Sequence, residues 1–208
     1  MIQDSFTRAN STTTLGSTDT GQVWTPQGTS TWGITSNQAY LVNTTANQEE
    51  FCVFESGLAD VRISIKMTVA GDMGIPFRFT DSNNCYTATS SPLDTIVVIS
   101  KVVGGVASDL GTATNYTAAN GDVLTLLAIG NSYTLQINGV TKFAATDATF
   151  LTQTIHGIKQ YPGINTQRFD EFSLTAIGSN ALSYPIRYRD VAPFKPGTPR
   201  RLWKRGLV

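Results

Sequence analysis

The chain has 208 residues and a mass of 22.4 kDa, enough for one large domain with a short extension. Charged residues make up only 14% of the sequence and glycines number 18, a composition that disfavours coiled coils and helical bundles and favours a β protein with many turns. The single histidine, His156, excludes a histidine-rich metal site. No apolar run approaches the roughly 18 residues of a membrane helix, and we recognise no secretory signal in the first residues.

The clearest strand signal spans residues 61–69. Every odd position in this segment is apolar and every even position is polar or charged. A period of two places one face of a strand on a core and the other in water. We therefore expect the odd positions to be core residues: Val61, Ile63, Ile65, Met67 and Val69.

Further strands are expected between the turn signals that follow. The β-branched run 96–103 predicts a more buried strand. Asn138-Gly139 predicts a two-residue hairpin turn, because both positions tolerate positive φ. In the closing strand, alternation places Phe169 on one face and Phe172 on the other. The remaining strands are expected at 123–129, 133–137, 140–144 and 169–177, with no helical periodicity anywhere in the chain.

Several short motifs follow one another in a characteristic order. They are 4–9 (DSFTRA), 21–24 (GQVW), 31–34 (TWGI), 76–86 (PFRFTDSNNCY), 138–139 (NG) and 168–173 (RFDEFS). Taken together over about residues 4–177, they resemble the concanavalin A-like jelly-roll family, which includes laminin G-like modules and the lectin/glucanase sandwiches, in modules of the kind found in bacteriophage and bacterial surface proteins. The resemblance implies two packed antiparallel sheets, one of them concave and often used to bind carbohydrate or protein. We expect an all-β, two-sheet antiparallel jelly-roll sandwich over residues 1–180.

Residues 181–208 are expected to form a basic, proline-rich, extended C-terminal arm. Residues 1–183 carry eight basic and fourteen acidic side chains, a balance of −6, whereas residues 184–208 carry seven basic and one acidic, a balance of +6. Four of the eight prolines lie in the same segment, and proline neither continues a sheet nor forms a helix. The residues expected to bind a partner are Arg187, Arg189, Lys195, Arg200, Arg201, Trp203, Lys204 and Arg205.

Three readings of the arm are open. Trp and Arg dominate the energetics of protein interfaces, which favours docking on a protein. A solvated tail is the second reading, and contact with nucleic acid through phosphate pairing and stacking is the third. An acidic body and a basic arm suit docking best, because opposite charges steer the encounter.

A polar cluster predicts a candidate ligand loop formed by Asp81, Asn83, Asn84 and Tyr86. Oxygen ligands on a loop are what Ca²⁺ requires, so Ca²⁺ is a possible cofactor here. Ordinary turn chemistry explains the same Asp and Asn residues and is the interpretation we favour. No other metal or cofactor is predicted.

The aromatic and cysteine residues each allow two roles. Aromatic rings stack on sugars or fill a sandwich core, and we expect core roles for Trp24 and Trp32. Cys52 and Cys85 lack the spacing of zinc or redox motifs, so we expect two half-buried thiols, with a disulfide left open. The other candidate stacking rings are Tyr40, Tyr86, Tyr116 and Tyr133.

No catalytic residue is predicted. Glycoside hydrolases on the resembled fold carry a pattern like Glu-x-Asp-x-x-Glu on one strand, with an acid and a nucleophile about 5 Å apart in retaining enzymes. This chain has no such run, and the adjacent pair Glu49-Glu50 would point to opposite faces of a strand. No Ser/His/Asp arrangement is evident either. We expect a protein that is not an enzyme.

These observations lead to one expected function and two alternatives. We expect a bacteriophage virion structural protein, either a capsid decoration (cement) protein or a minor tail component, made in the host cytoplasm and placed on the particle surface. Its partners would be capsid or tail proteins and copies of itself, with a trimer favoured, and not nucleic acid or a membrane. The first alternative is a lectin-like adhesin binding host-surface glycan, and the second is a degenerate glycoside hydrolase.

Overall fold

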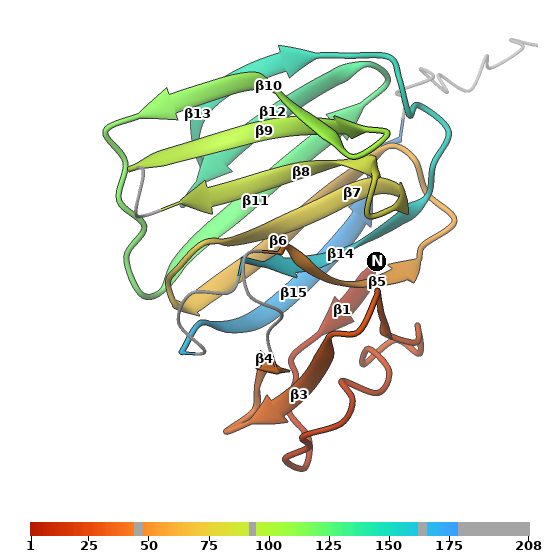
Figure 1. The fold of residues 1–208 in the computed structure, drawn as a ribbon, viewed down its shortest axis with the longest axis vertical. Coiled ribbons are helices and arrows are strands. Elements are labelled where there is room, and N and C mark those ends of the chain that lie inside the picture. Colours follow the sequence, from red (N-terminus) through yellow and green to blue (C-terminus); the bar gives the residue numbers. More distant parts are fainter. Residues whose placement is uncertain (44–47, 92–94, 162–165, 179–208) are drawn as a thin grey trace, which may run out of the picture.

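The computed structural model describes residues 1–43, 48–91, 95–161 and 166–178. Within these ranges the chain forms two antiparallel sheets stacked face to face (Figure 1). The expected all-β sandwich with two antiparallel sheets is therefore confirmed. The predicted arm, including all eight of its expected partner-binding residues, lies outside the described residues.

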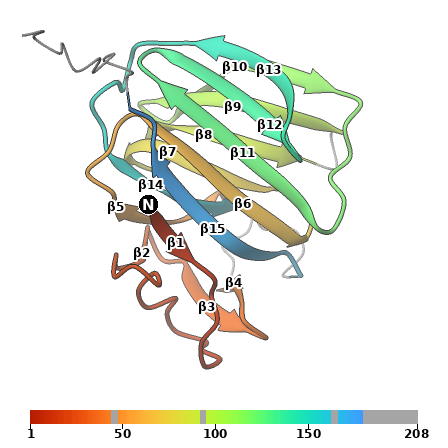
Figure 2. The same cartoon turned by 180° about the vertical axis from the view of Figure 1, so that it is seen from behind.

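One sheet has eight strands and is seen from the front in Figure 2. Its strand order is β13-β12-β11-β6-β15-β4-β3, and β1 pairs separately with β15. The two strands at its centre, β6 and β15, are far apart in sequence. The bounds are β1 (Ile2–Asp4), β3 (Thr31–Thr35), β4 (Gln38–Asn43), β6 (Val61–Val69), β11 (Asp122–Ile129), β12 (Ser132–Ile137), β13 (Val140–Thr146) and β15 (Arg168–Ala176).

The other sheet has seven strands in the order β10-β9-β8-β7-β14-β5-β2. Its centre is the hairpin of β7 and β8, with β14 inserted beside β7. At one side of the sandwich the edge strands β10 and β13 lie against each other. The bounds are β2 (Thr25–Pro26), β5 (Glu50–Glu55), β7 (Met73–Asp81), β8 (Asn84–Ser91), β9 (Ile96–Val103), β10 (Val106–Thr114) and β14 (Ile155–Gln160).

The predicted core strand 61–69 is confirmed as β6, with the expected bounds. Four of its odd positions are completely buried, whereas Val69 at the end of the strand is only half-buried. The core roles expected of Trp24 and Trp32 are also confirmed. Trp24 packs edge-on against Phe54 and Phe172, with ring centroids 4.9 and 5.3 Å away. The apolar core therefore lies between the two sheets, as alternation predicts.

The prediction for the closing strand was wrong at one point. Phe169 and Phe172 are both buried in the core, although simple alternation puts them on opposite faces. The pairing of β15 with β6 shifts register between Asp170 and Ser173, and Glu171 has a positive φ of 49°. A bulge inserts an extra residue and resets the side-chain alternation. Two large rings thereby reach the same core.

A buried arginine joins loops from both sheets. The guanidinium of Arg78 on β7 is fully buried and donates to the carbonyls of Ala59 (3.2 Å) and Gly130 (2.7 Å), to the Tyr133 hydroxyl (2.9 Å) and to an Asp60 carboxylate oxygen (3.0 Å). Gly130 and Tyr133 belong to the eight-stranded sheet, and Ala59 and Asp60 lie in the connection from β5 to β6 that joins the two sheets. Arg78 therefore links the two layers at one end of the sandwich.

Candidate functional site

The outward face of the seven-stranded sheet carries a row of hydroxyl side chains. On β8, Tyr86 and Ala88 point into the core, so alternation turns Thr87, Thr89 and Ser91 outward. These outward residues are nevertheless only 3–5% exposed. Polar side chains this deeply covered on the outer face of a sheet indicate a recessed surface.

Two adjoining hollows occupy this recessed surface, and we call them together the groove. The first has a volume of about 220 Å³ and the second about 430 Å³. The second alone falls within the roughly 300–1,000 Å³ of small-ligand sites. Glu49, Val102 and Ala107 line both. The first is also lined by Asp72, Thr87, Thr89, Ser91, Ile96, Val98, Ser100, Asp109 and Lys159, and the second by Gln48, Phe51, Ser82, Asn83 and Gly105.

Most polar groups in the groove are paired with one another. The ammonium of Lys159 on β14 forms an ion pair with Glu49. The Ser100 hydroxyl donates to the Asp109 carboxylate at 2.8 Å, and the Ser91 hydroxyl donates to the Asp72 carboxylate at 3.3 Å. Thr89 is different, because its buried Oγ1 has no hydrogen-bond partner among the described residues. A buried hydroxyl without a partner costs free energy and is a position where a ligand can bind.

An apolar cluster lies beside the hydroxyl row. Phe51, Val53, Phe79 and Cys85 bury one another on this outer face, and Phe51 lines the second hollow. Burial and the nearby negative charge of Glu49 raise the pKa of the Cys85 thiol to about 12, so it stays protonated and is a poor nucleophile.

The two cysteines are free thiols. Cys52 belongs to the core between the sheets, whereas Cys85 belongs to the apolar cluster on the outer face. Both are fully buried rather than half-buried as expected. The disulfide that the sequence left open is therefore not formed.

In the structure, Asp81, Asn83 and Asn84 of the candidate ligand loop each make different contacts. Asp81 lies at the tip of the β7–β8 hairpin and accepts hydrogen bonds from the Asn83 amide (2.8 Å) and the Asn84 side chain (3.0 Å), which is turn chemistry. Asn83 lines the second hollow, and Asn84 accepts from the amide of Gly104 at 3.1 Å. The loop thus forms one rim of the groove.

Tyr86 does not belong to this loop. Its ring is fully buried between the sheets, stacked on Phe77 at 5.1 Å, and its hydroxyl donates to Asp147. The inclusion of Tyr86 as a ligand residue was wrong because its position on β8 points inward. Tyr133 is also a core residue. Tyr40 and Tyr116 are half-buried and contact the cationic groups of Arg168 and Lys142.

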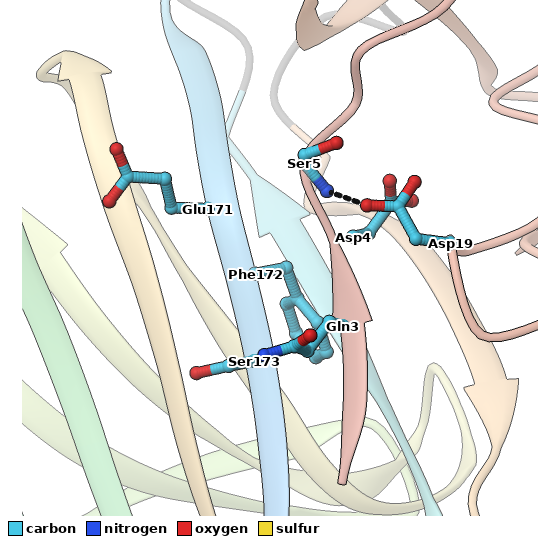
Figure 3. A pocket seen from close by; sticks show the side chains of 7 residues that line it. All are labelled: Gln3, Asp4, Ser5, Asp19, Glu171, Phe172 and Ser173. Carbon is cyan, nitrogen blue, oxygen red and sulfur yellow. Dashed lines mark hydrogen bonds between the residues drawn. The ribbon is translucent and has the colours of Figure 1, made fainter.

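A third hollow lies beside β1 and β15 on the eight-stranded sheet (Figure 3). Its volume is about 370 Å³ and three carboxylates stand around it. Asp4 accepts from the Trp24 indole at 2.7 Å, Asp19 accepts from a backbone amide at 2.8 Å, and Glu171 pairs with Lys66 at 2.7 Å. These carboxylates serve to anchor the first strand and the bulge. The lining residues are Gln3, Asp4, Ser5, Asp19, Glu171, Phe172 and Ser173.

Neither a metal cluster nor a membrane span is found in the described ranges. No three His, Cys, Asp or Glu side chains there gather closely enough to hold a metal ion. The described residues also include no helix of the length and apolarity that crossing a membrane requires. The hydrogen bonds at Asp81 agree with the turn chemistry that the sequence analysis favoured, and Ca²⁺ binding at the hairpin loop stays the untested alternative.

The fold is similar to several solved structures, among them a carbohydrate-binding module. The carbohydrate-binding module CBM66 from Bacillus subtilis superposes with a TM-score of 0.63 at 18% identity, over 74% of this chain and 95% of that chain. The exoplasmic/lumenal domain of VIP36, in its Ca²⁺/Man3GlcNAc-bound form, superposes with a TM-score of 0.56 at 12% identity, over 74% of this chain and 84% of that chain. A Bacillus subtilis protein of unknown function with a galectin-like fold superposes with a TM-score of 0.54 at 12% identity, over 73% of this chain and 88% of that chain.

No family model and no curated protein matches this sequence. The likeness therefore concerns the fold, and the chain has the architecture of a lectin-type jelly roll. The expected resemblance to concanavalin A-like lectin modules is confirmed at this level. The bacteriophage context stays a prediction.

Sequence reasoning missed most of the groove. It singled out Asn83, but not the hydroxyl row of β8 or the Lys159–Glu49 pair. The available signal was the alternation in 86–91, YTATSS, which places three hydroxyl residues on one face of a strand. What the pattern could not indicate is that this face is recessed.

Proposed function

We propose that this protein binds carbohydrate in the groove on the outer face of the seven-stranded sheet. The observation that carries the proposal is the covered hydroxyl row on β8, in which the buried Thr89 hydroxyl has no partner among the described residues. A sugar hydroxyl both donates and accepts hydrogen bonds, and therefore matches threonine, serine and carboxylate groups lining one hollow.

The groove also offers the apolar surface that a sugar ring needs. The CH groups of a pyranose or furanose ring form apolar patches. Val102 is partly exposed, lines both hollows and packs against the apolar cluster that includes buried Phe51, so it supplies a matching apolar surface next to polar groups. The fold comparison supports the same class of ligand. One similar structure is a carbohydrate-binding module, and another holds Man3GlcNAc.

The side chains of the groove favour binding over catalysis. Glu49 is engaged by Lys159 and Asp109 by Ser100, on separate segments of the chain. His156 points into the sandwich, where its Nδ1 accepts from the Arg78 amide at 3.3 Å and its Nε2 contacts the Leu58 carbonyl at 2.8 Å. Neither arrangement supplies the paired acid and nucleophile of glycoside hydrolysis. A non-enzymatic binding module is what we propose.

The virion role remains a separate prediction that concerns where the binding module is used. It depends on the basic segment 181–208, which lies outside the described residues. Light scattering after size exclusion, at low and high salt, tests it. A salt-sensitive oligomer supports docking of the arm on an acidic body, whereas a monomer at both salts argues against self-assembly through the arm.

A glycan array tests the proposed function, with variants that alter only the groove. Ala107 is exposed and lines both hollows, so Ala107→Trp should block the groove without disturbing the core. Val140 on β13, 62% exposed, provides the control variant Val140→Trp. We expect binding by the wild type and by Val140→Trp, and none by Ala107→Trp.

A second pair of variants tests the hydroxyl row. Thr89→Val keeps the shape and removes the hydroxyl, which should weaken binding about threefold to tenfold. Thr134→Val makes the same change on the outer face of the eight-stranded sheet, away from the groove, and this variant should bind like the wild type. An array without any bound glycan, or equal binding by Ala107→Trp and the wild type, would remove the groove from consideration.

A further inference from the structure

The described groove residues carry an excess of negative charge. Glu49 stands where the two hollows meet, and Asp72 and Asp109 line the first hollow. Lys159 is the single basic residue among the lining residues that the structure describes. Three carboxylates against one ammonium give a local balance of −2. The groove therefore presents a negative potential to an approaching ligand.

The one ammonium is not available to a ligand. Lys159 is 1% exposed, and Glu49 forms an ion pair with its Nζ. An anionic ligand could reach the ammonium only by displacing Glu49 into the remaining negative field of the groove. Asp109 differs from Lys159, because it is exposed on the edge strand β10 and accepts one hydrogen bond from Ser100. Its carboxylate faces the ligand side of the hollow.

A second, independent feature of this surface is a buried hydroxyl without a hydrogen-bond partner in the part of the chain that the structure describes. Thr89 lies at the centre of the sheet, opposite Val98 of β9 in the strand register, and it is 5% exposed. Its hydroxyl lacks a partner among the described residues, although two neighbouring hydroxyls and two carboxylates of the groove are paired with one another. Because the unsatisfied hydroxyl is neutral, this observation is independent of the count of carboxylates in the groove. It calls for a ligand that donates or accepts a hydrogen bond.

We propose that the groove selects glycans that are uncharged or carry protonated amino groups, and excludes glycans that carry carboxylate or sulfate groups. This inference rests on the proposed carbohydrate-binding function and assigns the charge class of the ligand. A neutral or amino sugar satisfies the Thr89 hydroxyl without meeting repulsion from Asp109. An acidic sugar adds a further negative charge to a groove that is already negative and whose only described ammonium is paired with Glu49.

The size of the effect follows from the charge of one carboxylate. Two unit charges on the order of 5 Å apart in water change an affinity by about fourfold. Two such charges multiply their effects, so a net balance of two negative charges weakens binding of a singly charged acidic ligand by roughly 10- to 20-fold at low salt. Exposed charges are screened at high salt, so the difference shrinks there.

The test uses a matched pair of ligands. The neutral oligosaccharide that binds best on the array is compared with its own derivative, in which one primary hydroxyl is oxidised to a carboxylate. Dissociation constants are measured by calorimetry at about 20 mM and about 500 mM salt. The variants are Asp109→Asn, and Asp19→Asn as a control that removes one exposed carboxylate from the hollow on the other sheet.

We expect the acidic derivative to bind the wild type roughly 10- to 20-fold more weakly at low salt, with a smaller difference in affinity at high salt. Asp109→Asn should narrow the low-salt gap about fourfold, and Asp19→Asn should leave it unchanged. Equal or tighter binding of the acidic derivative would overturn the charge selection, as would a gap that neither salt nor Asp109→Asn alters. Either result leaves carbohydrate binding itself standing, whereas an array without any bound glycan removes both proposals.

Discussion

Replacing Arg78 should destabilise the sandwich more than any exposed arginine does. Its guanidinium is completely buried and donates five hydrogen bonds, which reach Ala59, Asp60, Gly130 and Tyr133. Arg78→Ala leaves these groups without their donor and opens a cavity between the sheets. Each buried group that loses its hydrogen-bond partner costs about 1–3 kcal/mol, and the cavity adds to this cost. Because the Asp60 side chain is 35% exposed, its unpaired carboxylate adds less than a buried charge would. We therefore expect a loss of unfolding free energy of about 3–5 kcal/mol.

Urea denaturation followed by tryptophan fluorescence and by far-ultraviolet circular dichroism measures this loss. In a domain of this size it corresponds to a fall in Tm of roughly 6–20 °C. Arg78→Lys keeps the charge but has a single ammonium in place of the planar guanidinium. The free energy of unfolding of this variant should therefore lie between those of the alanine variant and the wild type. The control is Arg62→Ala, which changes an exposed arginine on β6 and should stay within about 0.5 kcal/mol of the wild type.

A cost below about 1 kcal/mol for Arg78→Ala would refute this reasoning. It would mean that water replaces the guanidinium without penalty, and hence that the junction of the two sheets is open to solvent. A large cost for Arg62→Ala would refute it in another way, because arginine on this surface would then stabilise the fold through charge rather than through burial.

Three further predictions concern the core, the buried histidine and the arm. Ile65→Ala should lower the free energy of unfolding by about 2–5 kcal/mol in the same denaturation assay, since Ile65 is fully buried; a cost near zero would contradict its place in the core. Burial lowers the pKa of His156 to about 4, so the unfolded chain binds more protons and stability falls as the pH drops from about 6.5 to about 4. The full loss is roughly 3 kcal/mol, and a His156→Gln variant with the same pH dependence would show that another group is responsible. Deleting residues 184–208, or making Trp203→Ala, should leave the β-type circular dichroism intact and abolish assembly in light scattering; loss of the β signal would contradict the separation of arm and body.

Local pattern determined which segments of this chain become strands. The alternation over residues 61–69 and the β-branched run over 96–103 reproduce β6 and β9 with the same bounds. Asn138-Gly139 predicted the turn of a hairpin that the structure contains, and both residues have positive φ. These features depend on neighbours in the chain, because side-chain period and turn conformation are local properties.

Only the tertiary structure decided where a strand departs from its alternation and which face of a sheet is recessed. The bulge at Glu171, which brings Phe169 and Phe172 to the same core, depends on how β15 pairs with β6 about a hundred residues away. Lys159 and Glu49 meet in the groove because β14 pairs with β5 across a similar separation. The sequence therefore predicts a sandwich with hydroxyl residues on one strand face, but long-range strand pairing decides that this face is recessed, since such pairing arises from contacts that no local pattern encodes.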